Sequence, residues 1–418
     1  MARLVIEGGH RLNGAVHIHG AKNSALPILA ATLLAHGVCE IENCPALSDV
    51  RAAGEILRHL GCRVAFEGSC VTVDATAPTC YDIPDALMRE MRSSIVFLGA
   101  IAARMGVAEL SFPGGCELGP RPIDLHLSAL RRMGLHIDEE GGKLCCRVSG
   151  RLKGCPITLS FPSVGATENI LLAAVTAEGT TTINNAAREP EIVDLCEFLT
   201  ACGASVIGAG ESTIVIHGVE RLNGCRHRVI PDRIETVTYM GAAAVTGGSL
   251  LLRGVCPSHL QAVTPLFEEM GCSLASWGDE LLVSAPPRLR RVRTVRTLPY
   301  PGFPTDAQAL LMAMACVAEG TSVFIETIFE SRYKHVGELM RLGAHIKVEG
   351  RVAVVEGIPQ LSGASVQCTD LRGGAALVLA GLAAQGKTEI SELFHLARGY
   401  EAIAEDLTRV GASLILET

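Results

Sequence analysis

The chain has 418 residues, a formal net charge of -8, 19% charged residues and 4% aromatic residues. No apolar run is long enough to cross a bilayer, and residues 1–14 carry charges where a signal peptide would have an apolar core. An acidic chain with few aromatic residues is a poor candidate for nucleic-acid binding. We therefore expect a soluble cytoplasmic protein of more than one domain, with neither a nucleic-acid nor a membrane partner.

The cysteines of the chain, sixteen in all, are scattered and include no Cys-x-x-Cys pair. This pattern favours reduced, mostly buried thiols over a disulfide framework or a zinc site. We expect neither a metal nor a cofactor.

Two kinds of helix alternate along the chain. The first kind is apolar nearly all round, which is typical of a helix buried on every side. We predict such helices over residues 24–35, 94–104, 166–177, 236–245, 307–318 and 373–384.

The second kind of helix is amphipathic, and each example is followed by a glycine that favours a C-cap. The predicted helices cover residues 52–59, 125–132, 193–200, 260–269, 336–341 and 403–409, and the glycines are Gly61, Gly134, Gly203, Gly271, Gly343 and Gly411. Alternating residues such as 345–348 predict strands after the glycines, and one more strand joins the two helices, as over 38–41, 181–183 and 323–326.

The glycines recur about every 70 residues, which indicates six similar units. Each unit has the predicted order helix, strand, helix and strand pair. Six units divide most simply into two groups of three. We therefore expect an α/β fold of two domains separated by a cleft, with apolar helices inside and sheets toward solvent.

Charged and hydroxyl residues recur just before these helices. Those before the apolar helices are Lys22, Arg92, Ser163, Arg233, Asp306 and Arg372; those before the amphipathic helices include Asp49, residues 116–124, Arg188, Glu189, Glu191, Ser258, Arg332 and Arg398. Helix N-termini and arginines together bind phosphate or carboxylate groups. We predict an anion site in the cleft; for any single arginine, a solvated charge or a helix-end ion pair is the alternative.

The segment 113–124 combines a thiol, carboxylates and a guanidinium in a loop rich in glycine and proline. A single cysteine is more often a small buried hydrophobe, but Cys116 lies five residues before Arg121, where a cation favours the thiolate. In contrast, residues 381–388 match a nucleotide P-loop in letters only, because the predicted order is helix before strand and a P-loop needs the reverse.

Several of these segments resemble the UDP-N-acetylglucosamine 1-carboxyvinyltransferase family of enolpyruvyl transferases. The resemblance runs from end to end and is carried by residues 20–23, 91–94, 113–124, 163–167, 187–191, 231–236, 303–306, 370–372 and 397–400. It implies a two-domain inside-out α/β barrel of six repeats. Domain I would span residues 22–229, and domain II residues 1–21 and 230–418.

The resemblance also implies an activity. The enolpyruvyl group of phosphoenolpyruvate would pass to the 3'-hydroxyl of UDP-N-acetylglucosamine through a tetrahedral ketal, with release of phosphate. This is the first committed step of peptidoglycan synthesis, and it implies small-molecule substrates without an obligate protein partner.

Residue roles follow from the same resemblance. Asp306 would take the hydroxyl proton, and Cys116 would act as a general acid or aid product release; Cys116 would also form a phospholactoyl adduct and be alkylated by fosfomycin. Phosphoenolpyruvate contacts are implied for Lys22, Asn23, Arg92, Arg121, Arg332, Arg372 and Arg398, of which Lys22 and Arg398 count as catalytic. Sugar-nucleotide contacts are implied for Asn23, Arg92, Arg121, Pro122, Ile123, Asp124, Leu125, Ser163, Val164, Gly165, Asp306 and Ile328.

Two positions depart from the family. Val96 and Phe161 stand where some members place Trp and Lys near the uridine, so those contacts do not transfer. We expect the acceptor to bind first and the Cys116 loop to close as a lid.

Three alternatives remain open at this stage. They are 5-enolpyruvylshikimate-3-phosphate synthase activity, a non-catalytic sugar-nucleotide sensor and a structural repeat scaffold. The first would lack the Pro-Gly-Gly-Cys loop, the second would be expected to lose Cys116 or Asp306, and the third gives no reason for the recurring arginines.

Overall fold

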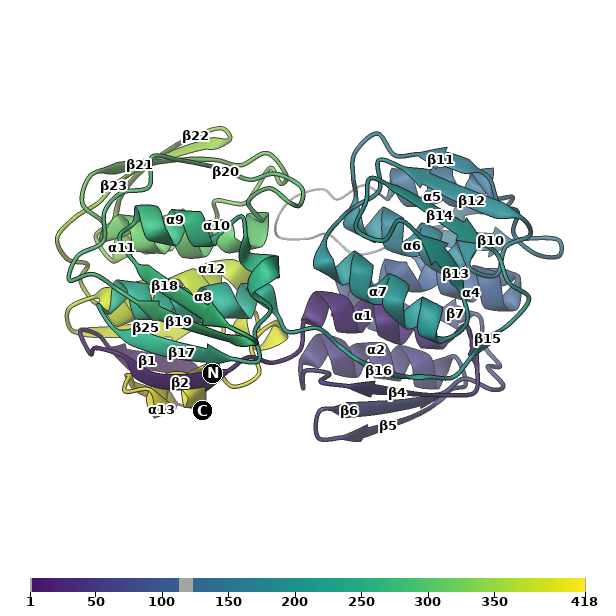
Figure 1. Cartoon of the computed structure of the whole chain (residues 1–418), viewed down its shortest axis with the longest axis horizontal. Helices are drawn as coiled ribbons and strands as arrows, with labels where there is room; N and C mark the ends of the chain where they lie inside the picture. The colour runs from purple at the N-terminus through teal and green to yellow at the C-terminus, as the bar shows by residue number, and fades with distance from the viewer. Residues whose placement is uncertain (1, 113–122, 418) are drawn as a thin grey trace. The chain divides into compact units, whose positions relative to one another are not determined.

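The computed structural model describes residues 2–112 and 123–417, which form two compact units (Figure 1). Unit 1 contains residues 2–19 and 231–417, and unit 2 contains residues 20–112 and 123–230. The chain therefore leaves unit 1 after His19 and returns to it at Pro231. Across these two ranges, none of the helices combines the length and the apolar character that a membrane span requires.

Each unit contains three sheets of four strands among its described residues. In unit 1 the sheets have the orders β24-β25-β1-β26, β18-β19-β17-β2 and β20-β21-β23-β22. Their strands are β1 (Arg3–Glu7), β2 (Asn13–His17), β17 (Ser249–Arg253), β18 (Ser273–Trp277), β19 (Glu280–Ser284), β20 (Thr294–Arg296), β21 (Thr321–Ile325), β22 (His345–Glu349), β23 (Val352–Glu356), β24 (Ser365–Gln367), β25 (Lys387–Ser391) and β26 (Ser413–Glu417).

Unit 2 repeats this plan with the orders β16-β4-β6-β5, β7-β8-β10-β9 and β11-β12-β14-β13, and adds the short pair β15-β3. Its strands are β3 (Ala35–His36), β4 (Val38–Glu42), β5 (Arg63–Glu67), β6 (Cys70–Asp74), β7 (Asp82–Ile83), β8 (Val107–Ser111), β9 (His136–Glu140), β10 (Lys143–Arg147), β11 (Pro156–Thr158), β12 (Thr180–Asn184), β13 (Ser205–Ile207), β14 (Thr213–His217), β15 (Leu222–Asn223) and β16 (Arg226–Arg228).

The predicted apolar helices form the interior of each unit. In unit 1, α8 (Arg233–Val245), α10 (Thr305–Cys316) and α12 (Leu371–Ala383) contact one another, and every residue of α10 from Ala307 to Cys316 is buried. In unit 2, α4 (Phe97–Met105), which follows the short helix η1 (Arg92–Val96), contacts both α1 (Lys22–Thr32) and α6 (Val164–Ala174). The prediction of apolar helices inside is confirmed.

The amphipathic helices each bury an apolar side, and α2, α5, α7 and α11 contact the interior helices. They are α2 (Ser48–His59), α5 (Asp124–Arg132), α7 (Pro190–Ala201), α9 (Thr264–Glu269), α11 (Val336–Arg341) and α13 (Ile403–Arg409), accompanied by η2 (Pro257–Leu260), η3 (Leu396–Arg398) and the extra helix α3 (Asp85–Glu90). The predicted helix 260–269 is wrong in its first turn. Pro265 has no N–H for a helical hydrogen bond, so η2 ends first and α9 begins at Thr264.

The glycine after each amphipathic helix has the predicted left-handed backbone, with φ between +93° and +106° at all six positions. Each glycine N–H donates to the carbonyl three residues earlier, and the next N–H donates to the carbonyl five residues before it, as in Gly343 to Met340 and Ala344 to Leu339. This pair of hydrogen bonds is the Schellman motif. It ends each helix at a fixed residue and directs the chain into a strand.

The prediction of a strand pair in every unit is wrong for the last one. Among the described residues after Gly411, which run to 417, the only strand is β26, and its partner is β1, which lies between β25 and β26 in the sheet. The other N-terminal strand, β2, pairs with β17. Residues 3–17 therefore complete two sheets of unit 1, and local periodicity could not reveal this long-range pairing.

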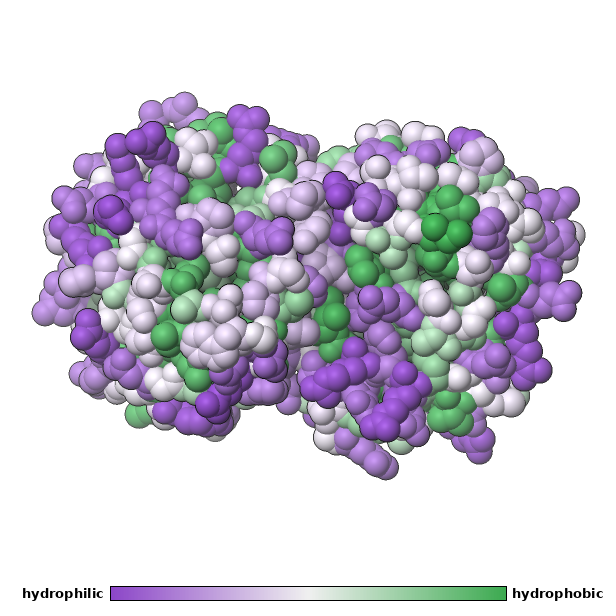
Figure 2. Space-filling model, viewed as in Figure 1, coloured by the Kyte–Doolittle hydropathy of each residue, from purple (hydrophilic) through white to green (hydrophobic). Residues whose placement is uncertain are grey.

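The surface agrees with this inside-out arrangement. On the visible face of each unit, hydrophilic and neutral residues predominate and hydrophobic residues are scattered between them (Figure 2). The large hydrophobic side chains that are exposed lie mostly on sheets, for example Trp277 and Ile415. Single residues of this kind are ordinary on a soluble surface.

Two glycines in and after helix α11 offer a test of the Schellman caps. Gly343 has φ +93° and open space where an added Cβ would stand, whereas Gly337 lies inside α11 with equal space and no left-handed backbone. Gly343→Ala should lower the free energy of unfolding by about 1 kcal/mol, because alanine is strained there, and Gly337→Ala should raise it by about 0.5–1 kcal/mol. Denaturant unfolding measures both, and effects of the same sign would contradict the proposed caps.

Candidate functional site

The carboxylate of Asp306 lies between two buried arginines in unit 1. Arg332 Nη2 donates to Asp306 Oδ1 at 3.0 Å and to the Thr305 carbonyl at 3.0 Å, and Arg372 donates to Oδ2 through Nε at 3.3 Å and Nη2 at 3.2 Å. The side chains of Arg332 and Arg372 are only 2% and 3% exposed, against 27% for Asp306. One carboxylate thus faces two guanidinium groups, which leaves one positive charge uncompensated within these three side chains. We call these residues, with Tyr400, the Asp306 cluster.

The cluster contains a further hydrogen-bond donor, Arg332 Nε. Arg332 Nε is buried and has no hydrogen-bond partner among the described atoms. Because an unsatisfied buried donor is costly, this atom favours an additional acceptor at the site. A phosphate or carboxylate group supplies such an acceptor together with the missing negative charge.

Tyr400 and the first turn of α12 hold Arg372 in place. Its Nη1 donates to the Tyr400 hydroxyl at 3.3 Å, and that hydroxyl lies 2.8 Å from Thr238 Oγ1. Burial acts to lower the pKa of Arg372, but Asp306, Tyr400 and Asp232 together outweigh it and raise that pKa. Arg372 therefore stays charged although it is buried.

Asp370 fixes the backbone from which Arg372 projects. Its Oδ1 accepts hydrogen bonds from the Arg372 and Gly373 N–H groups, both at 3.0 Å, and so caps α12. Such a cap satisfies orphan donors of the first helical turn. Arg398 lies near the same end, because η3 packs on α12 and Gly399 lies against Leu371.

Glu326 connects the predicted sugar-nucleotide residue Ile328 to the start of α10. Its Oε1 accepts from the Ile328 N–H at 2.8 Å and the Phe329 N–H at 3.0 Å, while Oε2 accepts from Thr305 Oγ1 at 3.0 Å. This side chain is fully hydrogen-bonded and 1% exposed. The sequence interpretation missed Glu326, which gives no signal beyond its place at the end of a predicted strand.

In unit 2, Lys22 is the first residue of α1 and forms a buried ion pair. Its Nζ lies 3.1 Å from Asp49 Oδ2 in the first turn of α2, and the two side chains are 10% and 3% exposed. Asn23 follows in α1 and is partly exposed. Asp49 thus holds the amine of Lys22 near the N-terminal ends of α1 and α2.

Asn169 joins the other predicted segments of unit 2. Its Oδ1 accepts from the Gly99 N–H at 2.7 Å, and its Nδ2 lies 3.0 Å from the Ile95 carbonyl and 2.8 Å from His126 Nδ1. We call Asn169, His126 and these two backbone groups the Asn169 network. It connects helix α6, which begins with Val164 and Gly165 after the cap Ser163, to α4 and α5.

His126 must be neutral to take part in this network. Burial lowers its pKa to about 4, so Nδ1 accepts a hydrogen bond from the Asn169 amide at neutral pH. The ring also lies under Gly165, where an added Cβ would be 3.1 Å from His126 Cε1. Asp124 and Leu125 begin the same helix, α5, and Ile123 precedes it.

Glu168 is a second buried group that the sequence interpretation missed. Burial, followed by the nearby charges of Glu191 and Glu189, raises its pKa to about 8. Glu168 therefore binds a proton at neutral pH. It lies in α6 beside the Asn169 network, whereas Glu189 and Glu191 begin α7.

Not every recurring basic residue belongs to these groups. Arg188 Nε donates to the Gly210 carbonyl at 2.9 Å, and the Arg233 guanidinium lies 5.8 Å from the ring centre of Tyr300. Arg92 begins η1, but the structure describes only its backbone. Cys116, Arg121 and Pro122 lie outside the described residues.

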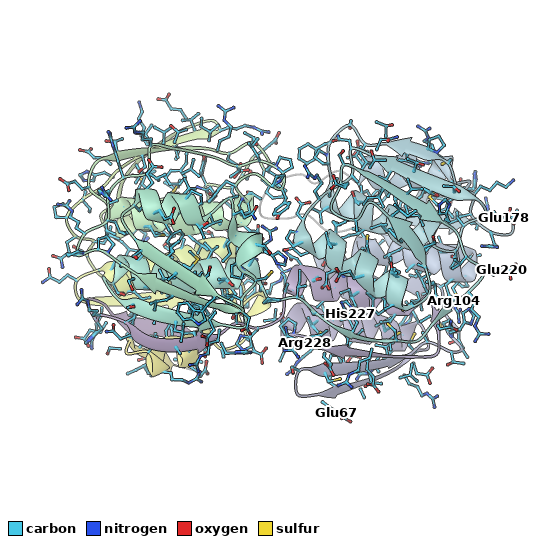
Figure 3. The ribbon with its side chains drawn as sticks, viewed as in Figure 1. Glu67, Arg104, Glu178, Glu220, His227 and Arg228 are labelled. Carbon is cyan, nitrogen blue, oxygen red and sulfur yellow. The ribbon has the colours of Figure 1, made fainter. Side chains whose placement is uncertain are left out.

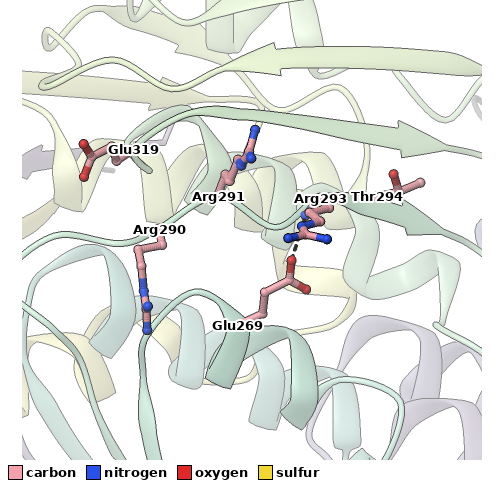
Figure 4. Close-up of a pocket in the computed structure, with 6 residues that line it drawn as sticks. All are labelled: Glu269, Arg290, Arg291, Arg293, Thr294 and Glu319. Carbon is pink, nitrogen blue, oxygen red and sulfur yellow. Dashed lines mark hydrogen bonds between the residues drawn. The ribbon is translucent and has the colours of Figure 1, made fainter.

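A groove of about 790 Å³ in unit 1 is separate from the Asp306 cluster. It is lined by Glu269, Arg290, Arg291, Arg293, Thr294 and Glu319, and Figure 4 shows arginines and glutamates facing it from several segments. Glu319 follows the C-terminal end of α10, whereas Asp306 lies at its N-terminal end, about 18 Å away along the helix. The groove therefore does not contain the predicted site residues.

Comparisons with known proteins agree with this architecture. The model of the EPSP synthase (3-phosphoshikimate 1-carboxyvinyltransferase) family matches residues 6–407. UDP-N-acetylglucosamine 1-carboxyvinyltransferase 2 of Caldanaerobacter subterraneus subsp. tengcongensis is 50% identical over 415 residues, covering 99% of both chains. UDP-N-acetylglucosamine 1-carboxyvinyltransferase 1 of Symbiobacterium thermophilum is 51% identical over 417 residues, covering 99% of this chain and 94% of the relative.

Solved structures extend the comparison to the fold. The enolpyruvyl transferase NikO from Streptomyces tendae superposes with a TM-score of 0.91 at 30% identity, covering 100% of this chain and 99% of the other. An EPSP synthase from Acinetobacter baumannii gives a TM-score of 0.76 at 20% identity over both full chains, which shows a shared fold. The predicted two-domain α/β fold is confirmed.

The neutral state of His126 predicts a specific pH dependence. Because its folded pKa of about 4 lies below the ordinary value of 6.5, it contributes stability above pH 6.5, and this contribution is lost as pH falls from 6.5 toward 4. In the wild-type protein, protonation of His126 should cost on the order of 2–3 kcal/mol of unfolding free energy between pH 6.5 and 4, and His126→Gln should remove this loss. His345→Gln, at a mostly exposed histidine, is the control. Urea unfolding at several pH values measures the effect, and an unchanged acid dependence in His126→Gln would refute it.

Proposed function

This chain belongs to the EPSP synthase (3-phosphoshikimate 1-carboxyvinyltransferase) family, and on that basis we propose that it transfers the enolpyruvyl group of phosphoenolpyruvate to the 3'-hydroxyl of UDP-N-acetylglucosamine. The observation that carries the proposal is identity of about half over nearly the whole length to two relatives named for this reaction. Phosphate is the second product, and the reaction begins peptidoglycan synthesis.

The proposed cellular setting follows from these substrates. Both are intracellular metabolites, so we place the enzyme in the cytoplasm, where it serves cell-wall biogenesis and therefore cell shape and division. Cys116 forms the phospholactoyl adduct and is the thiol that fosfomycin alkylates. These assignments rest on the family resemblance of residues 113–124.

The chemistry requires an acid, a base and an anion clamp. Protonation of the methylene carbon of phosphoenolpyruvate gives an oxocarbenium-like centre, and the sugar hydroxyl adds to it. The resulting ketal then loses phosphate and a proton. Fixed cations stabilise the charge that develops on the phosphate.

The Asp306 cluster supplies the clamp and the base from the same side chains. In the structure, both carboxylate oxygens of Asp306 accept hydrogen bonds from Arg332 and Arg372, and these bonds compete with acceptance of a proton. When phosphoenolpyruvate brings its own negative charges to these guanidinium groups, they release Asp306 to accept the hydroxyl proton. Substrate binding thus activates the base, and unproductive proton transfer is avoided before both substrates are present.

The remaining residues divide between the two substrates. Lys22, Asn23, Arg92, Arg121 and Arg398 assist Arg332 and Arg372 with phosphoenolpyruvate, and Cys116 acts as general acid or aids product release. The sugar nucleotide contacts the helix starts at Ile123–Leu125 and Ser163–Gly165, together with Asn23, Arg92, Arg121, Pro122, Asp306 and Ile328. The Asn169 network and Glu326 keep these contacts in place.

Phosphate release tests the proposed reaction. Release from phosphoenolpyruvate should require UDP-N-acetylglucosamine and should not occur with shikimate 3-phosphate. Cys116→Ala and Asp306→Ala should each lower kcat at least about 100-fold, because Asp306 is the proposed base and Cys116 the proposed general acid or product-release group. Release that depends on shikimate 3-phosphate, or no release with either acceptor, would contradict the proposal.

Arg372→Lys tests the clamp separately from the fold. A lysine cannot donate to Asp306 and Tyr400 through one planar fork, so kcat/KM for phosphoenolpyruvate should fall about 100-fold, or about 2.7 kcal/mol. Arg253→Lys, whose side chain is 56% exposed in the same unit, should have no effect. Steady-state kinetics with a thermal-unfolding check provides the measurement, and equal kcat/KM values for both variants would disprove the clamp.

A further inference from the structure

Three cysteine side chains meet in unit 2, away from the residues assigned to the reaction. Cys39 belongs to β4, Cys202 caps the C-terminus of α7, and Cys225 precedes β16. The Cys202 and Cys225 sulfurs are 3.3 Å apart, and Cys39 lies close enough to both for their thiols to lower its pKa. We call these residues the thiol trio.

The backbone holds the trio closely together. The Asn223 N–H donates to the Cys202 carbonyl at 2.8 Å, and the Glu40 N–H donates to the Cys225 carbonyl at 2.9 Å. Strands β16 and β4 pair in parallel (Figure 1), and Gly224 touches the Val38 backbone so closely that a Cβ would clash. The sulfurs thus need to move by only about 1.2 Å to reach the length of a disulfide bond.

A second contact fixes Cys225 to the helix that carries Cys202. His227, labelled in Figure 3, lies two residues after Cys225, and its Nε2 is 2.8 Å from Asp194 Oδ1 on α7. Asp194 Oδ2 also accepts from the Ile230 N–H at 3.2 Å. Helix α7 and the segment 225–230 therefore keep their relative positions when the sulfurs react.

The trio also has the reactivity and access that oxidation requires. The pKa of Cys39 is lowered because the thiols of Cys202 and Cys225 hydrogen-bond to its sulfur, so a thiolate charge is stabilised within the trio. Cys39 and Cys202 are buried, whereas Cys225 is partly exposed. The Cys202 thiol acts to lower the pKa of Cys225, but the contact with Cys39 and burial outweigh it and raise that pKa to about 11, so Cys39 is the group that takes up the Cys225 proton.

We propose that the thiol trio is a peroxide-reactive site at which Cys202 and Cys225 form a reversible disulfide bond. The Cys225 sulfur attacks a hydroperoxide oxygen while Cys39 takes up the Cys225 proton, the O–O bond breaks, and Cys225 becomes a sulfenic acid while hydroxide or alkoxide leaves. The Cys202 sulfur then attacks Cys225, the S–O bond breaks, and water leaves with the Cys202 proton. Two thiols lose two electrons to the peroxide, and a dithiol reductant reverses the bond.

The bond would connect α7 to the segment that returns to unit 1 at Pro231. Its formation does not depend on the proposed transferase activity. Oxidation of Cys116 would affect activity independently, so the test uses a chemical readout.

The full-length reduced protein is treated with hydrogen peroxide, its free thiols are alkylated, and its peptides are mapped by mass spectrometry. We expect one linked peptide that joins Cys202 to Cys225, two fewer alkylated thiols per chain and full reversal by dithiothreitol. Cys225→Ser and Cys202→Ala should each abolish the linked peptide, and thermal unfolding confirms that both variants are folded.

Cys145→Ser is the matched control, because Cys145 is also partly exposed in unit 2 and should not affect the bond. Cys39→Ser should slow formation of the bond and leave its position unchanged. Complete alkylation of Cys202 and Cys225 after peroxide treatment would overturn the proposal. So would a linked peptide that joins either residue to Cys116, or stable oxidation of Cys225 without a link.

Discussion

The carboxylate of Asp306 is the one group on which the site in unit 1 depends, because it stabilises two arginines buried beneath the surface. A buried guanidinium group without a negative partner is costly, and two adjacent ones repel each other. Asp306 compensates for only half of this charge, and Asp232 contributes further negative charge near Arg372. The cluster is therefore stable enough to fold and still favours an added anion.

Helix ends provide the geometry for this charge arrangement. Asp306 lies in the first turn of α10, and Arg372 lies in the first turn of α12, whose N-terminus is capped by Asp370. In unit 2, Lys22, Asp124 and Gly165 likewise lie within the first two residues of α1, α5 and α6. The Schellman glycines fix where the amphipathic helices end, and the caps Ser163, Asp232 and Asp370 mark where α6, α8 and α12 begin. The repeated scaffold thus presents partial positive charges and basic side chains from equivalent positions.

Sequence periodicity predicted most of the fold because its signals are local. Apolar helices, C-cap glycines and the strands after them all appear within one unit of the repeat. The pairing of β1 with β26 could not be predicted in this way, since the two strands stand at opposite ends of the chain. Pro265 shortened one predicted helix for a reason that the residue itself shows, although the prediction overlooked it.

The sequence predicted the charged residues of the candidate site but not the side chains that hold them in place. Basic residues at recurring positions identified Arg332 and Arg372, but the same pattern included Arg188, which instead contacts the Gly210 carbonyl. Asn169, Glu168 and Glu326 have no distinguishing sequence signal, since their roles come from side chains contributed by other helices or strands. A single sequence shows residue types and spacing, whereas these contacts depend on tertiary packing.

The most direct test of this account is the thermal unfolding of the wild-type protein and of Asp306→Asn with and without inorganic phosphate. The neutral amide removes the carboxylate charge that pairs with both buried guanidinium groups, so the variant should unfold at a lower temperature in buffer. Phosphate should then raise its Tm by more than it raises that of the wild-type protein. Equal Tm values in buffer, together with equal shifts by phosphate, would contradict the central role of Asp306.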